Sequence, residues 1–310
     1  MNILISAIIC THNRAEYLVK ALQSLLDQNL HKDTYEIIIV DNCSTDSTEE
    51  VIKKTLNKNI RYLYESKLGL SYARNTGWQN ARGKYVAYLD DDAIACPTWL
   101  SKILEVFETV KPRPGCVGGK VNPIWEAPRP SWISDELLTS LTIINWSDIP
   151  HNLTDLNRKW LVGANIAFPT AVLKHVGGFT HDLDRKGKHL LSGGDVFLEK
   201  QIQKAGYTCF YHPEIAIHHL TPTSRLNQRW FTCRYYWQGI SDAIMQLIEE
   251  TPSIAERINC AAIKLYSLLQ SPRTIINLIL PRKDPKRFTE KCFALITVGH
   301  IAGLLGAGRR

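Results

Sequence analysis

Short apolar runs alternate with segments of helical periodicity in the first third of the chain, and this alternation most restricts the fold. Runs typical of buried strands occupy residues 3–10, 36–41, 60–66 and 84–92. Segments with apolar residues at helical spacing lie between them, at residues 15–28, 46–58 and 68–81. Strands that alternate with helices predict an α/β fold with a mostly parallel, twisted sheet and helices on both of its faces.

Each of the four predicted strands ends in a cluster of polar residues. The clusters are "CTHNR", "VDNCSTD", "ESKLGL" and, after the fourth strand, the successive acids Asp90, Asp91 and Asp92. In a parallel sheet the carboxyl ends of the strands meet at one rim, which is where ligands bind. We therefore expect the four clusters to lie together and form a binding site.

The three adjacent carboxylates need an explanation because they repel one another at the edge of an apolar core. A turn or a helix cap explains one aspartate, since Asp is favoured in both. A divalent cation such as Mg²⁺ explains all three better, because it takes one or two carboxylates and completes its shell with phosphate oxygens. The sequence thus favours a metal ion beside a phosphate-bearing ligand.

Composition and missing motifs argue against several classes of protein. The net charge of +7 favours anionic partners, but no dense Lys/Arg tract with interleaved aromatic residues is present, so nucleic acid is not expected. The eight cysteines include no C-x-x-C pair, which predicts neither a zinc site nor a disulfide framework and indicates a reducing, cytoplasmic setting. Neither the G-x-G-x-x-G fingerprint nor a P-loop occurs, which argues against dehydrogenases, kinases and ATPases.

The chain changes character after its first third. Residues 111–220 are rich in Pro, Trp and Gly, and the pattern becomes helical and basic from about residue 222. Apolar runs at 275–280 and 292–308 are too short to span a membrane, which predicts core helices or amphipathic helices on a membrane surface. The expected organisation is a first α/β half, a second half of the same domain and a helical extension, over residues 1–110, 111–235 and 236–310.

The runs "SAIICTHNRAEYLVKALQSLLDQ", "EIIIVDNCSTDST" and "ESKLGLSYARNTGWQNARGKYVAYLDDD" follow one another in an order that resembles family 2 glycosyltransferases. The resemblance continues through "WLVGANIAFPTAVLKHVGGF" and "SGGDVFLEKQIQKAGYTCFYHPEIAIHH" and covers roughly residues 5–240. It implies the GT-A fold and an inverting, metal-dependent enzyme that uses a nucleotide sugar, with a UDP-sugar expected. Mg²⁺ or Mn²⁺ is the implied cofactor, and a saccharide or lipid-linked saccharide is the implied acceptor.

The resemblance also implies roles for individual residues. Asp92 matches the direct metal ligand, and His218, in the pair with His219, matches a further metal or diphosphate contact. Asp90 and Asp91 are expected nearer the ribose or a metal-bound water, with Asp90 counted among the metal ligands as well. The residues expected to bind the nucleotide sugar are Thr11, Asn13, Arg14, Asp41, Arg74, Asp90, Asp91 and Asn165.

Several of these assignments compete with an ordinary structural role. Thr and Asn cap helices well, which applies to Thr11 and Asn13 ahead of the predicted helix at residue 15. Arg74 is equally explained by a surface ion pair, and such pairs are common. Asn165 is equally explained by a turn, and a histidine at position 218 by a structural role.

Asp195, in "SGGDVFLEK", matches the catalytic base that takes the proton of the acceptor hydroxyl. An N-cap role is compatible with the same position. The family usually pairs this Asp with a preceding Glu, where this chain has Gly194. Glu199, one helical turn later, is the obvious substitute acid, although its direction on the helix points it away from the acceptor.

Two other functions stay open at this point. The absence of the family's usual Glu at position 194, where this chain has Gly194, is compatible with a GT-A-fold binding or scaffold protein that has no turnover. A sugar nucleotidyltransferase also uses strand-end carboxylates and metal, but the glycine-rich N-terminal loop of those enzymes is missing. In "NQRW" the spacing of Gln228 and Arg229 departs from the Q-x-x-R-W signature of processive synthases, so a non-processive enzyme of polysaccharide or glycolipid assembly is expected. The basic, apolar C-terminal region predicts peripheral contact with the inner face of an anionic membrane.

Overall fold

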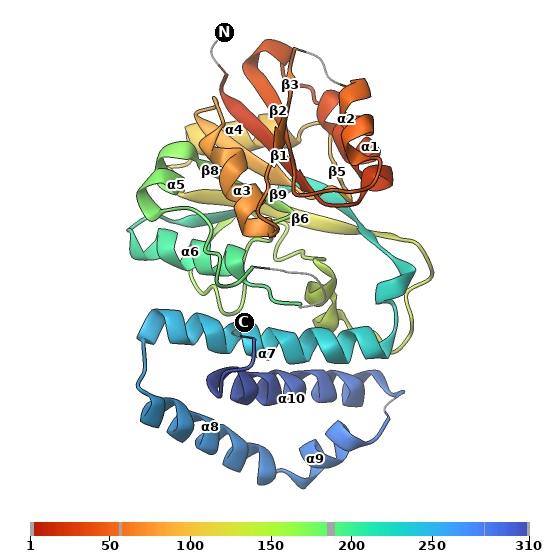
Figure 1. The fold of residues 1–310 in the computed structure, drawn as a ribbon, viewed down its shortest axis with the longest axis vertical. Helices are drawn as coiled ribbons and strands as arrows, with labels where there is room; N and C mark the ends of the chain where they lie inside the picture. The colour runs from red at the N-terminus through yellow and green to blue at the C-terminus, as the bar shows by residue number, and fades with distance from the viewer. Residues whose placement is uncertain (1–2, 56–57, 185–189, 282, 309–310) are drawn as a thin grey trace. The chain divides into compact units, whose positions relative to one another are not determined.

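A computed structural model describes residues 3–55, 58–184, 190–281 and 283–308 (Figure 1). The chain divides into two compact units. The first comprises Met1–Ile124, Thr142–His181 and Gly194–Leu220, and the second comprises Trp125–Leu141, Asp182–Gly193 and Thr221–Arg310. The sequence predicted a boundary at residue 235. This position lies inside α7 (Gln228–Glu250), which is one continuous helix.

The parallel half of the sheet in the first unit follows the predicted alternation. Its four strands are β1 (Ile5–Thr11), β2 (Tyr35–Asp41), β3 (Ile60–Tyr64) and β4 (Tyr85–Leu89). They lie in the order β3-β2-β1-β4, and every neighbouring pair is parallel. All residues of β2 and β4 are buried, as expected for strands covered on both faces.

Helices cover both faces of this parallel half, as predicted. The three connecting helices are α1 (Ala15–Leu26), α2 (Thr48–Thr55) and α3 (Leu70–Gln79). Leu18 of α1 shares one core cluster with Ile9, whereas Ala73 of α3 shares the other cluster with Ile8. Because successive side chains of a strand point to opposite faces, α1 and α3 lie on opposite sides of β1.

The other half of the sheet is antiparallel, so the prediction of a mostly parallel sheet holds only for the first four strands. It comprises β5 (Ala93–Ala95), β6 (Cys116–Trp125), β7 (His151–Leu153), β8 (Asn165–Pro169) and β9 (Cys209–Thr221). The sheet continues from β4 in the order β8-β6-β9-β5, with β7 beside β9. The pairs β4–β8, β6–β8, β5–β9 and β7–β9 are antiparallel.

Three further helices belong to the first unit: α4 (Trp99–Thr109), α5 (Thr170–Val176) and α6 (Gly194–Lys204). Single turns of 3₁₀ helix occur at η1 (Lys32–Thr34) and, after β9, at η3 (Thr223–Arg225). The start of α6 carries Asp195, the predicted catalytic base.

The second unit is helical, which confirms the predicted C-terminal helices. It contains a 3₁₀ segment η2 (Asp135–Leu141), α7, α8 (Ile254–Leu269), α9 (Pro272–Ile279) and α10 (Pro285–Leu304). Helices α7 and α10 lie side by side (Figure 1) and approach closely through Gly239 and Gly299. Over the part of the chain that the structure describes, none of the helices has the length and apolar character needed to cross a bilayer.

Candidate active site

The acid triplet lies between β4 and β5, at the carboxyl end of the parallel strands as predicted. Asp91 and Asp92 are buried, whereas Asp90 is partly exposed. The Thr11 hydroxyl, at the end of β1, donates a 2.8 Å hydrogen bond to Asp91. The Arg14 guanidinium forms ion pairs with Asp91 at 3.2 Å and with Asp92 at 2.5 Å. The residues after β1 and β4 therefore meet at one rim.

A histidine completes this acidic cluster, and it is His219. Pairing of β5 with β9 places His219 opposite Ala93, directly after the triplet. Its Nε2 atom lies 3.2 Å from Oδ1 of Asp92 and 3.8 Å from Oδ2 of Asp90. The structure does not bring His218 to the acids: it is exposed and, by strand alternation, points to the opposite side of β9.

The charges in the cluster depend on one another. Burial alone opposes ionisation of Asp90, but the neighbouring His219 and Arg74 outweigh it and lower its pKa. Burial likewise opposes protonation of His219, yet the two adjacent carboxylates raise its pKa to about 9. For Asp91 burial dominates over the neighbouring Arg14 and raises the pKa to about 7. The site thus balances buried carboxylates against three basic side chains.

The donor set of the cluster fits a hard divalent cation. One ligand atom from each of Asp90, Asp92 and His219 can be chosen so that all three lie within 4.8 Å of one another. Two carboxylates at this spacing suit Mg²⁺ or Mn²⁺, and the partly exposed Asp90 leaves room for water or phosphate oxygens. Of the two adjacent histidines, His219 and not His218 therefore lies within reach of a cation held by Asp90 and Asp92.

Asn13 joins the loops after β1 and β2, and Asp41 joins the end of β2 to β3. Asn13 has a positive φ of 54°, and its side-chain oxygen accepts a 2.6 Å hydrogen bond from the Thr45 N–H. Asp41 is buried, and its two oxygens accept hydrogen bonds from the Ser44 N–H at 2.9 Å and the Tyr62 hydroxyl at 3.1 Å. Each carboxylate oxygen retains a second lone pair with which it can accept from a ligand.

Arg74 is not on the surface of its helix. Its side chain is 10% exposed and its guanidinium lies 3.7 Å from Asp90, so a solvent-exposed ion pair does not describe it. Gly163 lies against the same guanidinium: a Cβ atom at position 163 would be 2.2 Å from the Arg74 Nη2 atom. Only a glycine lets the main chain approach the arginine this closely.

Asp195 reaches the same segment from the start of α6. It is half-buried, and its Oδ2 atom accepts a 2.8 Å hydrogen bond from the Gly163 N–H. Its Oδ1 atom accepts from the N–H of Val196 at 3.0 Å. Gly163 therefore lies between Asp195 and Arg74, the predicted base and the predicted diphosphate contact.

Asn165 has a structural role, which corrects its predicted contact with the donor sugar. The residue is fully buried. Its oxygen accepts a 2.8 Å hydrogen bond from the Trp99 indole, and its amide donates to the carbonyls of Ile215 and Lys120. These bonds tie α4, β6, β8 and β9 together and use both amide hydrogens of Asn165, whose side chain is fully buried.

Sequence reasoning missed His219 and the contact of Gly163 with Arg74. The first could not be chosen over His218 because both residues end the same strand, and only the register with β5 decides which faces the acids. The second had a signal in the sequence, a glycine in "LVGAN" directly before the apolar run that forms β8, where glycine often marks close approach of the main chain.

Comparison with known proteins agrees with this geometry. The family model for glycosyl transferase family 2 matches residues 6–175. The glucosyl-dolichyl phosphate glucuronosyltransferase of Haloferax volcanii is 26% identical over 253 residues, which cover 79% of this chain and 78% of the relative. Glycosyltransferase AglE of the same organism is 30% identical over 231 residues, covering 73% of this chain and 70% of the relative.

Solved structures share the fold. The mannosyltransferase PcManGT of Pyrobaculum calidifontis, solved with GDP-Man and Mn²⁺, aligns with a TM-score of 0.61 at 19% identity, over 97% of this chain and 87% of that one. Residues 1–349 of TarS from S. aureus align with a TM-score of 0.57 at 16% identity, over 97% and 89% of the two chains. From the family match and the shared fold, this chain belongs to glycosyl transferase family 2 and is a glycosyltransferase with the GT-A fold.

Proposed function

We propose that the enzyme transfers a sugar from a UDP-sugar to a hydroxyl group of a lipid-linked saccharide, with inversion at the anomeric carbon and with Mg²⁺ or Mn²⁺. The main support for the proposed metal and donor is the grouping of Asp90, Asp92 and His219 at the carboxyl end of the parallel strands. A nucleotide diphosphate leaves with growing negative charge on a phosphate oxygen, and a bound divalent cation would offset that charge.

The chain's own residues supply the other tasks in this proposal. Arg74, held beside Asp90 at 3.7 Å, adds positive charge on the diphosphate side of the acids. Asp41, at the end of β2, accepts from the imide N–H of a uracil base with a free lone pair. Thr11, Asn13 and Arg14 shape the loop that lines the nucleoside, in addition to the hydrogen bonds they make within the protein.

Asp195 is the proposed general base. Its oxygens each accept one main-chain N–H and keep a lone pair for the proton of the acceptor hydroxyl. A single base that activates the acceptor on the side opposite the leaving diphosphate gives inversion. Gly194 in place of the family's usual Glu removes a neighbouring acid but leaves Asp195 at the start of the helix.

Thermal unfolding with single nucleotides tests the donor and the metal. We expect UDP to stabilise the protein in the presence of Mn²⁺ or Mg²⁺, by about 2.7 kcal/mol at a hundred times Kd, and GDP to do so less. In Asp92→Ala the gain from adding metal to UDP should disappear. Stabilisation by UDP that is independent of metal, in both proteins, would overturn the metal assignment. A larger shift with GDP would overturn the choice of uridine.

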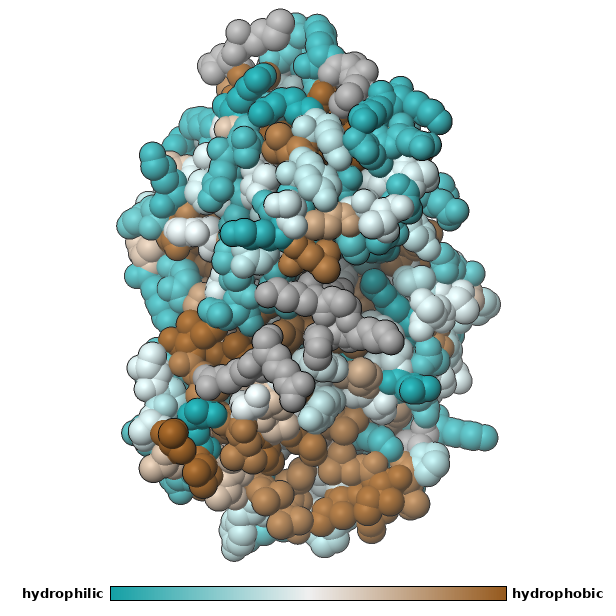
Figure 2. Space-filling view, viewed as in Figure 1, coloured by the Kyte–Doolittle hydropathy of each residue, from teal (hydrophilic) through white to brown (hydrophobic). Residues whose placement is uncertain are grey.

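We further propose that the second unit contacts an anionic membrane, which would bring the enzyme to its lipid-linked acceptor. Large apolar side chains are exposed along α8 and α9, and Figure 2 shows apolar side chains gathered on this face of the second unit. Those at least half exposed are Ile254, Ile258, Ile263, Tyr266, Leu269, Ile276 and Ile279.

Positive charge accompanies this apolar surface. Lys283, Lys286 and Arg287, in the turn after α9 and the start of α10, are exposed, and each basic residue near an anionic surface adds about 1 kcal/mol to binding. Two relatives are named for dolichyl-linked substrates: the Haloferax volcanii enzyme above, and a glucuronosyltransferase of Methanococcus voltae that is 35% identical over 129 residues, which cover 39% of this chain.

Vesicle sedimentation tests the membrane contact. The double variant Tyr266→Ser/Leu269→Ser should bind vesicles of phosphatidylglycerol and phosphatidylcholine at least about tenfold more weakly, because each large apolar side chain that leaves water contributes about 1.5 kcal/mol. Val19→Ser/Leu68→Ser is the matched control, since both residues are exposed apolar positions of the first unit. Equal binding by the double variant and the control would contradict a membrane contact through α8.

A further inference from the structure

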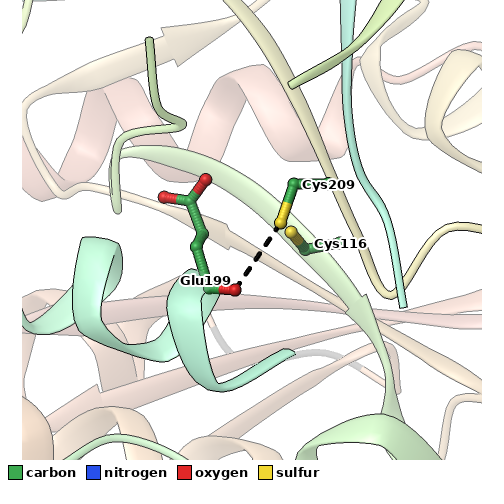
Figure 3. A group of neighbouring side chains, drawn as sticks. All are labelled: Cys116, Glu199 and Cys209. Carbon is green, nitrogen blue, oxygen red and sulfur yellow. Dashed lines mark hydrogen bonds between the residues drawn. The ribbon is translucent and has the colours of Figure 1, made fainter. Parts of the chain in front are cut away.

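Glu199 is a buried acid on α6 that the proposed mechanism does not use. It is fully buried and lies among the thiols of Cys116 and Cys209 (Figure 3). Burial, with the neighbouring Cys209 and Asp195, raises its pKa well above the ordinary value. A buried acid is costly to retain unless its oxygens have hydrogen-bond partners, so the contacts of Glu199 are informative.

The two acids of α6 fasten one segment of chain at two points. Both carboxylate oxygens of Glu199 accept from the Leu161 N–H, at 3.1 and 3.2 Å. One helical turn earlier, Asp195 accepts from the Gly163 N–H at 2.8 Å. Residues four apart lie on the same face of a helix, so the spacing of the acids matches the spacing of the two N–H groups.

The same segment sets the position of Arg74. The Gly163 main chain rests directly against the guanidinium, with no space for a Cβ atom. A shift of residues 161–163 would therefore move both Asp195, through its hydrogen bond to Gly163, and the Arg74 guanidinium, which Gly163 contacts. In the proposed reaction Asp195 acts on the acceptor and Arg74 acts on the diphosphate.

We propose that Glu199 is a positioning residue of the transfer reaction, which holds residues 161–163 so that Asp195 and Arg74 keep their places. The inference rests on the proposed roles of those two residues. The carboxyl group acts as a hydrogen-bond acceptor and takes no proton from the acceptor. It thereby stabilises the position of α6, which carries Asp195, from within the core.

A metal site is the competing explanation for the same three residues. One ligand atom each of Cys116, Cys209 and Glu199 can be chosen so that all lie within 4.8 Å of one another, and two thiols with a carboxylate suit Zn²⁺. The contacts favour positioning. The Cys209 thiol donates at 3.7 Å to the main-chain oxygen of Glu199, as the dashed line in Figure 3 shows, and the carboxylate is directed to Leu161.

Steady-state kinetics with three variants test the proposal. Glu199→Gln keeps an oxygen for the Leu161 N–H and should retain kcat and donor KM within about twofold of the parent. Glu199→Ala should lower kcat and raise donor KM, each by at least about tenfold, since small displacements of catalytic groups are costly. Ile202→Ala, a buried residue of the same helix, is the control for loss of stability and should change neither value at an equal folded fraction.

The outcomes separate this inference from the proposed function. Normal kcat and KM in Glu199→Ala, or equal losses in Glu199→Gln and Glu199→Ala, would overturn the positioning role. The positioning role would also be overturned if Zn²⁺ alone raised the unfolding temperature of the parent but not that of Cys116→Ser, because this result would identify a metal site. Full activity of Asp195→Asn would remove the base assignment only. In that case the donor KM of Glu199→Ala still tests the positioning of Arg74, because this value does not depend on which residue is the base.

Discussion

The Nε2 atom of His219 faces two carboxylates, 3.2 Å from Asp92 and 3.8 Å from Asp90. This arrangement depends on a strand pairing that joins residues more than a hundred positions apart, since β9 places His219 opposite Ala93 of β5. The Asp92 carbonyl also accepts a 3.0 Å hydrogen bond from the Leu220 N–H. The acids after β4 and the end of β9 are therefore held as one structure.

Substitution at the two adjacent histidines gives a matched test of this arrangement. His219→Ala should weaken Mn²⁺ binding, measured by calorimetry in the presence of UDP, by about tenfold or more, as expected when a group at a metal site is removed. His218→Ala should stay within about twofold of the parent, because this side chain is exposed on the other side of β9. The reverse order of effects would restore His218 as the ligand.

Asp195→Asn tests the proposed base. The amide keeps the size of the side chain and one oxygen for the Gly163 or Val196 N–H, so the unfolding free energy should change by less than about 1 kcal/mol. Transfer should fall by about 10²–10⁴-fold, the usual contribution of a general base. UDP binding serves as the control and should persist. Near-normal transfer at saturating donor would rule out Asp195 as the base.

Local sequence patterns predicted the parallel half of the sheet because each strand and its following helix are contiguous in the chain. The segments at residues 36–41 and 60–66 became β2 and β3 with boundaries shifted by at most two residues. The antiparallel half was not predicted. Strands such as β8 and β9 are paired over long distances in sequence, and a buried apolar run carries no sign of its direction.

The site was predictable where side chains follow strand ends and unpredictable where tertiary contacts decide. Asp90–Asp92 and Thr11 meet at one rim because parallel strands bring their carboxyl ends together. Asn165 illustrates the limit: its position resembles a family sugar contact, but the Trp99 indole and two carbonyls occupy its polar atoms. Only the packing of α4 against β8 reveals this.

The buried acid Glu199 predicts a specific pH dependence of stability. Its pKa in the folded protein is raised well above the ordinary 4.5 by burial. A raised folded pKa means that stability is fully present below pH 4.5 and is lost as pH rises toward the folded pKa. The unfolding free energy of the parent should therefore fall relative to Glu199→Gln by about 1.4 kcal/mol per pH unit over this interval.

Urea unfolding of both proteins between pH 4 and 8 measures this difference. Asp195, Cys116 and Cys209 are present in both proteins, so their own titration largely cancels in the comparison. A constant gap between the two unfolding free energies across the range would show that Glu199 titrates normally in the folded chain. The sign also matters, because an unfolding free energy of the parent that rises with pH relative to that of Glu199→Gln would indicate an ionised carboxylate with a lowered pKa.

The close packing of α7 on α10 predicts that the C-terminal helices cannot be altered at their contact without loss of stability. A Cβ atom at Gly239 would lie 1.9 Å from the Ile296 carbonyl oxygen, and one at Gly299 would lie 1.9 Å from the Tyr236 carbonyl oxygen. Neither main-chain atom can move without separating the helices. Gly239→Ala and Gly299→Ala should each lower the unfolding free energy by about 1–3 kcal/mol or more, despite the higher helix propensity of Ala.

Ser267→Ala, exposed on α8 of the same unit, is the control for these glycine variants and should change the unfolding free energy by less than about 0.5 kcal/mol. If both glycine variants were as stable as the parent in urea, α7 and α10 would not be in contact as described. Removing the chain after residue 250, where α7 ends, would then leave α7 folded, whereas the close contact predicts that this truncation exposes the apolar face of α7 and makes the protein aggregate.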